Sequence, residues 1–369
     1  MRLTIPRFKS KVGAIGVAFS DDEVRMLQVR ECHGSLGVTG AAHSASTTAA
    51  HMSNTLRDAI VAGGFVGRRC VVSLPDRDVL LQSIQLPRMS DQELDEAIAW
   101  EASQRMGVAR DSIQSDWLRT GAEDTQTAAR DEVLMVATRR DVLSARLDML
   151  VDAGLRPTAV DTTFGAIGRL FSRHHRRDAD RETSRAVLHV GNDESTFLVL
   201  RGDAIAFCKR IDTGGGAFDA CVAERLCLEP HAAGELRLAR LRSDASAIDP
   251  ATDRALREAI RPVTFDLAQQ VLLCLRYASV TFRGLSPERL ITTGEHGHEP
   301  ALLQALGSAS GVEVHVDDAK GTLGGLRQGL ASMLQREPSV MGAWATAAGL
   351  SVRGLHASQR SRTRRQVAA

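Results

Sequence analysis

The chain has 369 residues, of which 43% are hydrophobic, 25% charged and only 4% aromatic, as in an ordinary globular protein with an aliphatic core. Lys and Arg number 46 against 45 Asp and Glu, so the net charge of +1 provides no field that would attract nucleic acid, and we expect no nucleic-acid partner. The longest stretch without a charged residue, Cys32–Leu56, is rich in Ser, Thr, His and Gly and is not apolar enough to span a bilayer. The six cysteines are scattered without a C-x-x-C pair, which indicates reduced thiols and no metal site.

The N-terminal segment predicts a β-hairpin. An apolar run over 12–19 is followed by a polar turn and a second apolar run over 24–29. Basic residues before the first run also give it the look of a short secretion signal, but Asp21, Asp22 and Glu23 follow at once and no A-x-A cleavage site is present. We therefore interpret this run as the first strand.

The same pattern returns after the charge-rich segment 173–182. Strands are predicted over 186–190, 196–200 and 205–211, with a polar turn between the first two. Two halves that each open with a hairpin indicate a duplicated α/β architecture.

Helices are predicted between the strands. Ser90 and Glu93 form a capping box before an apolar stripe, a second stripe runs over 143–151 and ends at Gly154, and a third runs over about 254–277. The segment 71–86 reads as two strands around a turn at Pro75 and Asp76.

Four segments carry a resemblance to a known family. They contain an S-L-P turn with a later I-x-L-P strand and W-E-A helix, an A-G-L-x-P turn before A-V-D, a second hairpin with a Gly-rich turn, and G-A-W-A-T-A-A-G-L: residues 71–106, 133–170, 186–226 and 342–350. In their order and spacing, over about residues 12–350, they resemble the PilM family of actin-like type IV pilus proteins.

The resemblance implies a fold and its domain limits. The fold would be α/β, a duplicated actin-like, ribonuclease H-like bilobal architecture with a small α/β subdomain inserted in the first lobe, as in the division protein FtsA. Residues 1–68 and 158–182 would form the first lobe, 69–157 the inserted subdomain, 183–352 the second lobe, and 353–369 a basic disordered tail.

The resemblance also places a nucleotide cleft on this sequence. Its remnant positions would be Gly16, Ser20, Asp161, Gly191 and Gly294, where hairpin turns and a later glycine turn approach the nucleotide. Asp161 either faces this cleft or caps the helix that begins near Thr163.

Three departures from the family pattern weaken this cleft. Ala18 and His189 stand where each hairpin of the family carries Asp, and Glu295 stands where the adenosine turn carries its second Gly. Neither Ala nor neutral His offers the oxygen ligand that Mg²⁺ requires. We therefore expect no catalytic residues, no metal ligands and no cofactor, with Mg-ATP bound through the nearby Asp21, Asp22 or Asp193 as the alternative.

The expected function follows from the resemblance. The chain would be a cytoplasmic scaffold, peripheral at the inner face of the inner membrane, which binds the N-terminal tail of a PilN-like membrane protein. An active ATPase of pilus, secretion or division machinery is the alternative. Arg360, Arg362, Arg364 and Arg365 could contact anionic lipid, because the tail carries no acidic residue. The oligomeric state does not follow from the sequence.

Overall fold

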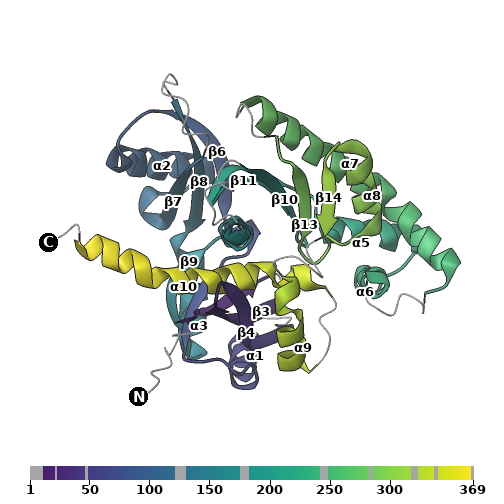
Figure 1. The fold of residues 1–369 in the computed structure, drawn as a ribbon, viewed down its shortest axis with the longest axis horizontal. Coiled ribbons are helices and arrows are strands. Elements are labelled where there is room, and N and C mark those ends of the chain that lie inside the picture. Colours follow the sequence, from purple (N-terminus) through teal and green to yellow (C-terminus); the bar gives the residue numbers. More distant parts are fainter. Residues whose placement is uncertain are drawn as a thin grey trace, which may run out of the picture.

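The structure, a computed structural model, contains two sheet-based lobes and a third, smaller unit (Figure 1). It describes residues 11–20, 23–45, 49–120, 130–174, 183–241, 248–281, 286–316, 323–335 and 340–366. Asp21 and Asp22 lie outside the described residues.

The first lobe is built on a sheet with the order β1-β3-β2-β5-β9, in which β4 also pairs with β3. The expected N-terminal hairpin is confirmed as the antiparallel pair β2 and β3, and β2, β5 and β9 run parallel. The strands are β1 (Lys11–Val12), β2 (Ile15–Phe19), β3 (Glu23–Cys32), β4 (Ser35–Ala45), β5 (Arg69–Ser73) and β9 (Arg156–Asp161).

Helices cover both faces of this sheet. On one face, α1 (Ala49–Ala62) and α3 (Arg140–Asp152) bury Leu56 and Leu150 against Val17 and Val72. On the other face lie α4 (Thr163–Phe171), followed by η3 (Ser172–His174), and α10 (Ala345–Gln366). Parallel strands need such two-sided cover because crossover helices pack on both faces.

The second lobe is built on a sheet with the order β12-β11-β10-β13-β14. Its strands are β10 (Ser184–Val190), β11 (Ser195–Arg201), β12 (Ala204–Ile211), β13 (Arg289–Thr293) and β14 (Glu313–Val316), so the three strands expected after residue 183 are confirmed. One face is covered by α5 (Gly215–Leu226), α6 (Pro230–Leu241), α7 (Pro250–Thr281) and α8 (Pro300–Ala309).

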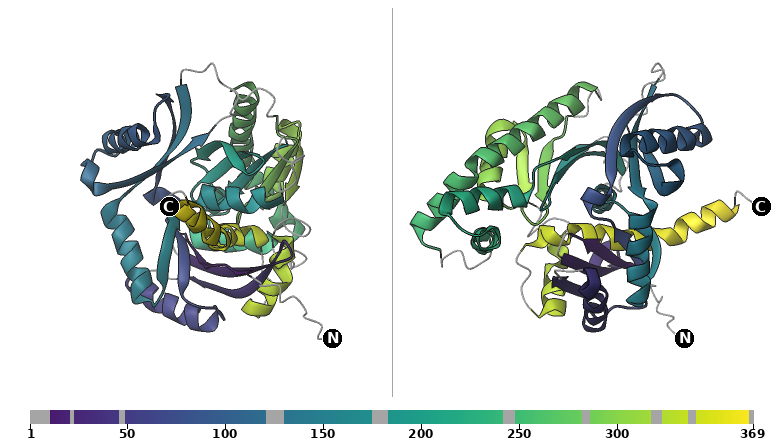
Figure 2. Two further views of the ribbon diagram at one scale, coloured as in Figure 1. Left: turned by 60° about the vertical axis from the view of Figure 1, so that its left-hand side comes forward. Right: turned by 180° about the vertical axis from the view of Figure 1, so that it is seen from behind.

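Helices α4 and α10 form a layer shared by the two lobes. One continuous core joins Leu27 of the first sheet, Ile167 of α4, Ala348 of α10 and Leu198 of the second sheet. Figure 2 shows α10 crossing the middle of the molecule between the lobes. The close approach depends on glycine, because a Cβ at Gly16 would lie 2.0 Å from the Ala347 carbonyl oxygen.

The smaller unit is a three-stranded antiparallel sheet, β6-β8-β7, with one helix on its face. It comprises η1 (Asp76–Asp78), β6 (Leu80–Pro87), α2 (Asp91–Met106), η2 (Arg110–Ser112), β7 (Ile113–Thr120) and β8 (Arg130–Arg139). The expected capping box is present, since the Ser90 hydroxyl accepts from the Glu93 N–H and the Glu93 carboxylate accepts from the Ser90 N–H. Leu94 and Ile98 then bury α2 on the sheet.

The limits of this unit are narrower than the expected 69–157. Strand β5 lies between β2 and β9, and α3 packs on the first sheet, so both belong to the first lobe. The unit therefore begins after β5 and ends at Arg139. The two strands expected within 71–86 do exist, but they belong to different sheets.

The second lobe also ends earlier than residue 352. From Leu323 onward the chain returns to the first lobe, where Leu326 and Leu330 pack beside Val38. The elements of this return are η6 (Gly324–Leu326), α9 (Arg327–Leu334), η7 (Met341–Trp344) and α10.

The expectation of a disordered tail from residue 353 was wrong for most of its length, because α10 continues through Gln366. Leu355 is buried in the shared core, and Arg353 forms an ion pair with Asp161. No proline interrupts the residues that follow, and Ala, Gln and Arg favour helix. The end of α10 extends away from the body of the molecule (Figure 2).

Candidate functional site

The first sheet presents three side chains toward the second lobe. Ala18, Ser73 and Asp161 are register neighbours at the carboxyl ends of β2, β5 and β9. Their neighbours Val17, Val72 and Val160 pack on the α1 and α3 side. Because side chains alternate along a strand, Ala18, Ser73 and Asp161 face the α4 and α10 layer.

The second sheet contributes His189 and Thr293, which are register neighbours on β10 and β13. Leu188 and Val190 pack in the core of the second lobe, so His189 and Thr293 face the opposite way, toward the shared layer. Burial lowers the pKa of His189 to about 4, so its ring is neutral at pH 7. Ala18 and His189 are thus both turned toward the layer of α4 and α10, one from each sheet.

Asp161 is held by two arginines. Its Oδ2 lies 2.8 Å from Arg169 of α4 and 2.8 Å from Arg353 of α10, and the carboxylate is only 7% exposed. Its Oδ1 accepts from the Thr162 N–H. The cap of α4 is Thr162, whose hydroxyl accepts from the Gly165 N–H, so Asp161 is not the capping residue. Asp161 lies two strands from Ala18 in the sheet.

The turn residues close on the protein's own backbone. The Ser20 N–H donates to the Glu23 carbonyl in the first hairpin, and the Gly191 N–H donates to the Glu194 carbonyl in the second. Gly191 and Asn192 in turn accept from the N–H groups of Gly215 and Gly216, both at 2.8 Å. These glycines open α5, where free N–H groups could otherwise bind a phosphate. In this Gly-rich strand-to-helix turn, the N–H groups of Gly215 and Gly216 are therefore already hydrogen-bonded.

Gly294 opens the turn after β13. Its φ of 93° and a Cβ that would lie 2.3 Å from the Val190 carbonyl oxygen both require glycine. This turn is therefore packed directly against the end of β10.

Glu295, the next residue, forms an ion pair with the first lobe. Its Oε2 lies 2.9 Å from Nη2 of Arg25 on β3, and Arg25 also lies 2.6 Å from Glu23. The two side chains are 12% and 29% exposed. The carboxylate of Glu295, which stands at the expected adenosine turn of the second lobe, is thus paired with an arginine of the first lobe.

A buried charged network fills the space behind this turn. Arg237 of α6, 0% exposed, lies 2.6 Å from Asp219 and 3.5 Å from Glu299, which is also 0% exposed. Nη2 of Arg237 donates to Nδ1 of His296 at 2.9 Å. The ring can accept this hydrogen bond because it is neutral: burial, and then the charge of Arg237, holds the pKa of His296 well below its usual value. Arg240 pairs with Glu299 as well.

Sequence reasoning did not identify Arg237, Arg240 or Glu299. One signal was available, since Arg237 and Arg240 continue the helical spacing of the buried Ala233. The ring of His296 packs over Gly215, where a Cβ would lie 2.1 Å from it. This packing links the network to the start of α5.

A second set of contacts joins the second lobe to the segment that connects the first lobe with the small unit. Arg210 of β12 donates to the carbonyls of Asp76 and Val79 at 3.0 and 2.8 Å and lies 2.7 Å from Glu194. Burial raises the pKa of Asp76 to about 6 and that of Glu194 to about 7. Arg210 thereby ties the second hairpin to the connection between β5 and β6.

Among the described residues, no cluster of three His, Cys, Asp or Glu side chains has an arrangement suited to a metal ion. No helix there has the length and apolar character needed to cross a membrane.

A family model described as "Type IV pilus assembly protein PilM" matches residues 16–354, most of the chain. The chain belongs to the PilM family. This confirms the resemblance carried by the four sequence segments. None of the curated proteins matches the sequence.

Solved structures agree on the fold. One similar solved structure is described as "PilM-PilN type IV pilus biogenesis complex". Its matching chain is 20% identical to this chain, with a TM-score of 0.73 and coverage of 93% of this chain and 98% of that chain. The ethanolamine utilization protein EutJ from Carboxydothermus hydrogenoformans is 12% identical, with a TM-score of 0.53 and coverage of 94% and 90%. At these identities the likeness shows the fold, and it confirms the expected actin-like bilobal architecture of this PilM-family chain.

Proposed function

We propose that this chain is a scaffold of type IV pilus assembly that closes its cleft with its own side chains and does not turn over nucleotide. The observation that carries the proposal is the pair of Arg25 and Glu295, which joins the lobes at the adenosine turn. The chain would act in the cytoplasm, peripheral to the inner membrane, without Mg-ATP as a cofactor.

Several features around the cleft support this reading. The strand ends offer Ala18 and a neutral His189 in place of oxygen ligands for Mg²⁺. The carboxylate of Asp161, the remaining acid among these positions, is neutralised by Arg169 and Arg353. These three positions therefore offer no free carboxylate to a metal-bound triphosphate.

The buried charged network supports the proposal at the place where adenosine would bind. Arg237 and Glu299 are fully buried, and their charges compensate each other and those of Asp219 and Arg240. A purine entering here would have to displace hydrogen-bonded charges, and separating buried partners is costly. The cleft is thus stabilised in the ligand-free state.

For the partner, we propose the N-terminal tail of a PilN-like inner-membrane protein, in line with the PilM–PilN complex among the similar structures. An extended peptide adds to a sheet through an unpaired strand edge. Strand β5 is paired on both sides, by β2 and β9, so it offers no edge. Strands β6 and β7 each pair only with β8 among the described strands, and of these two edges β6 is the one connected to the first lobe, through η1 and β5. We therefore place the tail along β6.

A calorimetric titration tests the partner and the edge together. The synthetic cytoplasmic tail of the membrane protein encoded beside this chain should bind the full-length protein, and a scrambled tail should not. Methylating single backbone nitrogens of the tail should weaken binding at every second residue, because alternate N–H groups face the strand edge. Binding that tolerates methylation at all positions would rule out strand addition, and no binding of the native tail would reject the partner.

A further inference from the structure

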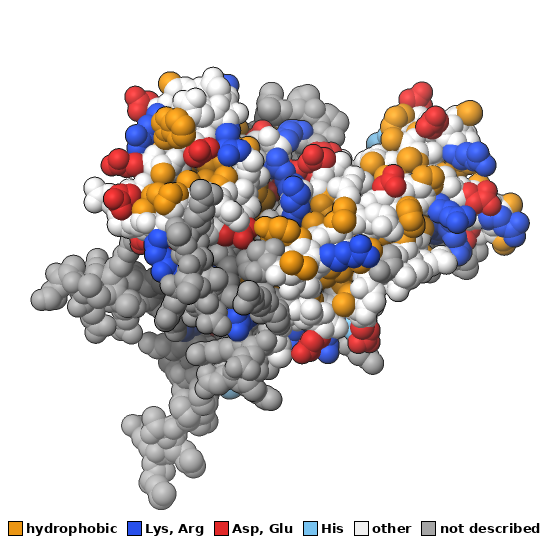
Figure 3. All heavy atoms as spheres, turned by 90° about the horizontal axis from the view of Figure 1, so that it is seen from above, with side chains coloured by type: hydrophobic (Ala, Val, Ile, Leu, Met, Phe, Trp, Pro, Cys, Tyr) orange, Lys and Arg blue, Asp and Glu red, His pale blue; other side chains and the backbone are white. Residues whose placement is uncertain are grey.

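Helix α7 carries hydrophobic side chains on two faces. Leu256, Ile260, Leu267 and Val271 are buried in the core of the second lobe. On the outer face, Phe265 is 54% exposed, Leu273 62%, Tyr277 44% and Val280 80%. Figure 3 looks onto this side of the molecule from above and shows hydrophobic side chains gathered among the charged ones.

The exposed residues form one stripe. Leu273, Tyr277 and Val280 follow a spacing of four and three residues, and Phe265 lies eight residues before Leu273. A surface helix normally shows polar residues on the face away from the core, so an apolar outer stripe indicates a partner.

Three pairs of residues on this face are placed symmetrically about the level of the buried Val271, while the exposed Leu273 has Gln269 as its counterpart. Phe265 and Tyr277 lie equally far from Val271, as do Asp266 and Arg276, and so do Pro262 and Val280. In two copies of α7 packed antiparallel across a two-fold axis at this level, each Asp266 faces the other copy's Arg276. A parallel pair would instead bring like charges together, Asp266 against Asp266.

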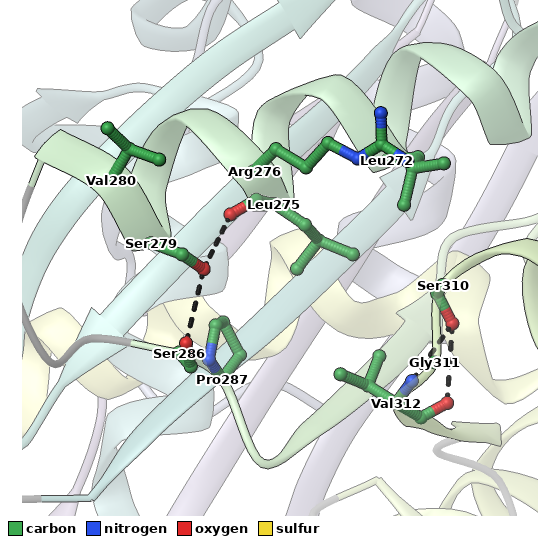
Figure 4. Close-up of a pocket in the computed structure, with 10 residues that line it drawn as sticks. All are labelled: Leu272, Leu275, Arg276, Ser279, Val280, Ser286, Pro287, Ser310, Gly311 and Val312. Atoms are coloured by element: carbon green, nitrogen blue, oxygen red, sulfur yellow. Dashed lines mark hydrogen bonds between the residues drawn. The ribbon is translucent and has the colours of Figure 1, made fainter.

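A hollow continues this face at its C-terminal end. It has a volume of about 430 Å³ and is lined by Leu272, Leu275, Arg276, Ser279, Val280, Ser286, Pro287, Ser310, Gly311 and Val312 (Figure 4). Val280 lines this hollow and is the position that the antiparallel arrangement places opposite Pro262. The apolar ring of Pro262 from the second copy would therefore lie at the rim of this hollow, beside Val280.

We propose that the outer face of α7 binds a second copy of this chain, in an antiparallel, two-fold symmetric dimer centred at Val271. The surface is self-complementary in charge and in apolar side chains, as such an interface must be. In this arrangement the two copies of α7 lie side by side over residues 261–281, about 31 Å of helix, which contains the whole exposed stripe.

The first test is the oligomeric state of the full-length protein by sedimentation velocity over a concentration series. The wild type should dimerise. The reversals Asp266→Arg and Arg276→Asp should each raise the dimer Kd by about tenfold or more, which corresponds to ~1.4 kcal/mol. The double variant should recover most of the loss, because the two charges are exchanged within one symmetric contact. The control Val61→Glu, at an 82% exposed valine on α1, should leave the dimer unchanged.

The second test fixes the direction of the helices. In a background with Cys32 and Cys227, the two exposed cysteines among the described residues, replaced by Ser, Phe265→Cys and Tyr277→Cys proteins are mixed and oxidised. The mixture should form a covalent dimer that neither protein forms alone. A wild type that stays monomeric throughout the series, a dimer indifferent to both reversals, or efficient cross-linking of Tyr277→Cys with itself would each overturn the proposal.

Discussion

Nη2 of Arg25 and Oε2 of Glu295 lie 2.9 Å apart although 270 positions separate the two residues, and they connect the first hairpin of one lobe with the glycine turn of the other. The pair is partly buried and adds a direct contact between the lobes to the core that they share through α4 and α10.

We expect a double-mutant cycle with Arg25→Ala and Glu295→Ala to give a coupling free energy of unfolding of about 1 kcal/mol. Hydrogen exchange of residues 294–299 should also become faster in both single variants, because the contact between the lobes is lost. The exposed pair Glu101 and Arg105, four residues apart on α2, serves as the control and should affect neither these amides nor the lobe contact. Zero coupling together with unchanged exchange would show that the pair does not hold the lobes.

The altered cleft predicts that the purified protein neither hydrolyses ATP nor gives measurable heat with Mg-ATP. Ala18→Asp with His189→Asp would return two oxygen ligands to the facing strand ends. Because Glu295 still places an anion at the adenosine turn, a third change, Glu295→Gly, should be needed for a clear gain in affinity. Titration calorimetry on the three proteins, with thermal melts to confirm folding, measures this. Micromolar binding of Mg-ATP by the wild type would contradict the proposed closed cleft.

The network behind the cleft should contribute strongly to stability. Glu299→Ala removes the carboxylate shared by Arg237 and Arg240 and leaves their charges without it in a buried site. We expect the free energy of unfolding in urea to fall by about 3–5 kcal/mol. The control Arg105→Ala removes the partner of Glu101 on α2, outside this network, and should change it by less than about 0.5 kcal/mol. A loss below about 1 kcal/mol for Glu299→Ala would mean that the network is hydrated.

The carboxyl groups around Arg210 predict a dependence of stability on pH. Burial raises the pKa of Asp76 from 3.8 to about 6 and that of Glu194 from 4.5 to about 7. The native state therefore keeps protons that the unfolded state has lost, and stability should fall as the pH rises from about 4 to 7 and then level off. Each group can contribute at most about 1.4 kcal/mol per pH unit to this slope.

Urea unfolding at several pH values checks this sign. Asp76→Asn and Glu194→Gln should each flatten the slope, since the amide cannot titrate. A control change at Asp148, an exposed carboxylate on α3 and outside this cluster, should leave it unaltered. A slope of the opposite sign would mean that Arg210 stabilises the ionised carboxylates more than burial disfavours them.

Contact of the C-terminal arginines with lipid remains a proposal that vesicle binding can test. Replacing Arg360, Arg362, Arg364 and Arg365 by Gln should lower partitioning to phosphatidylserine vesicles at least tenfold, at about 1 kcal/mol for each residue near the surface. Raising the salt concentration should weaken binding of the wild type in the same way. If the C-terminal residues are removed instead of substituted, the deletion should begin after Leu355, because that side chain is buried. Binding that persists in molar salt would exclude an electrostatic contact.

Local patterns predicted most of the elements. The two hairpins follow from alternation and turn residues, and the start of α2 follows from Ser90 and Glu93, because each signal lies within a few residues of its effect. The places of Ala18 and His189 on the first strand of each hairpin also followed from these patterns.

The missed features all depend on pairing between distant segments. Whether β5 belongs to the first sheet or to the small unit is decided by its contacts with β2 and β9. The role of Glu299 depends on arginines some sixty residues earlier on α6. Asp161 is neutralised in part by Arg353 on α10, which no spacing rule connects to it.

The return of α10 to the first lobe also sets the order in which the protein can fold. The Ser351 hydroxyl donates to the Ala14 carbonyl, and Gly16 packs against Ala347, so the first strands of the chain are covered by residues more than 330 positions later. During synthesis, the part of the first sheet's face that α10 covers stays open until residues 345–355 have left the ribosome. Contacts of such long range make folding slow and leave apolar surface exposed meanwhile. The second lobe and the small unit, whose own cores contain no residue of α10, can form first and then receive the first sheet when α10 arrives.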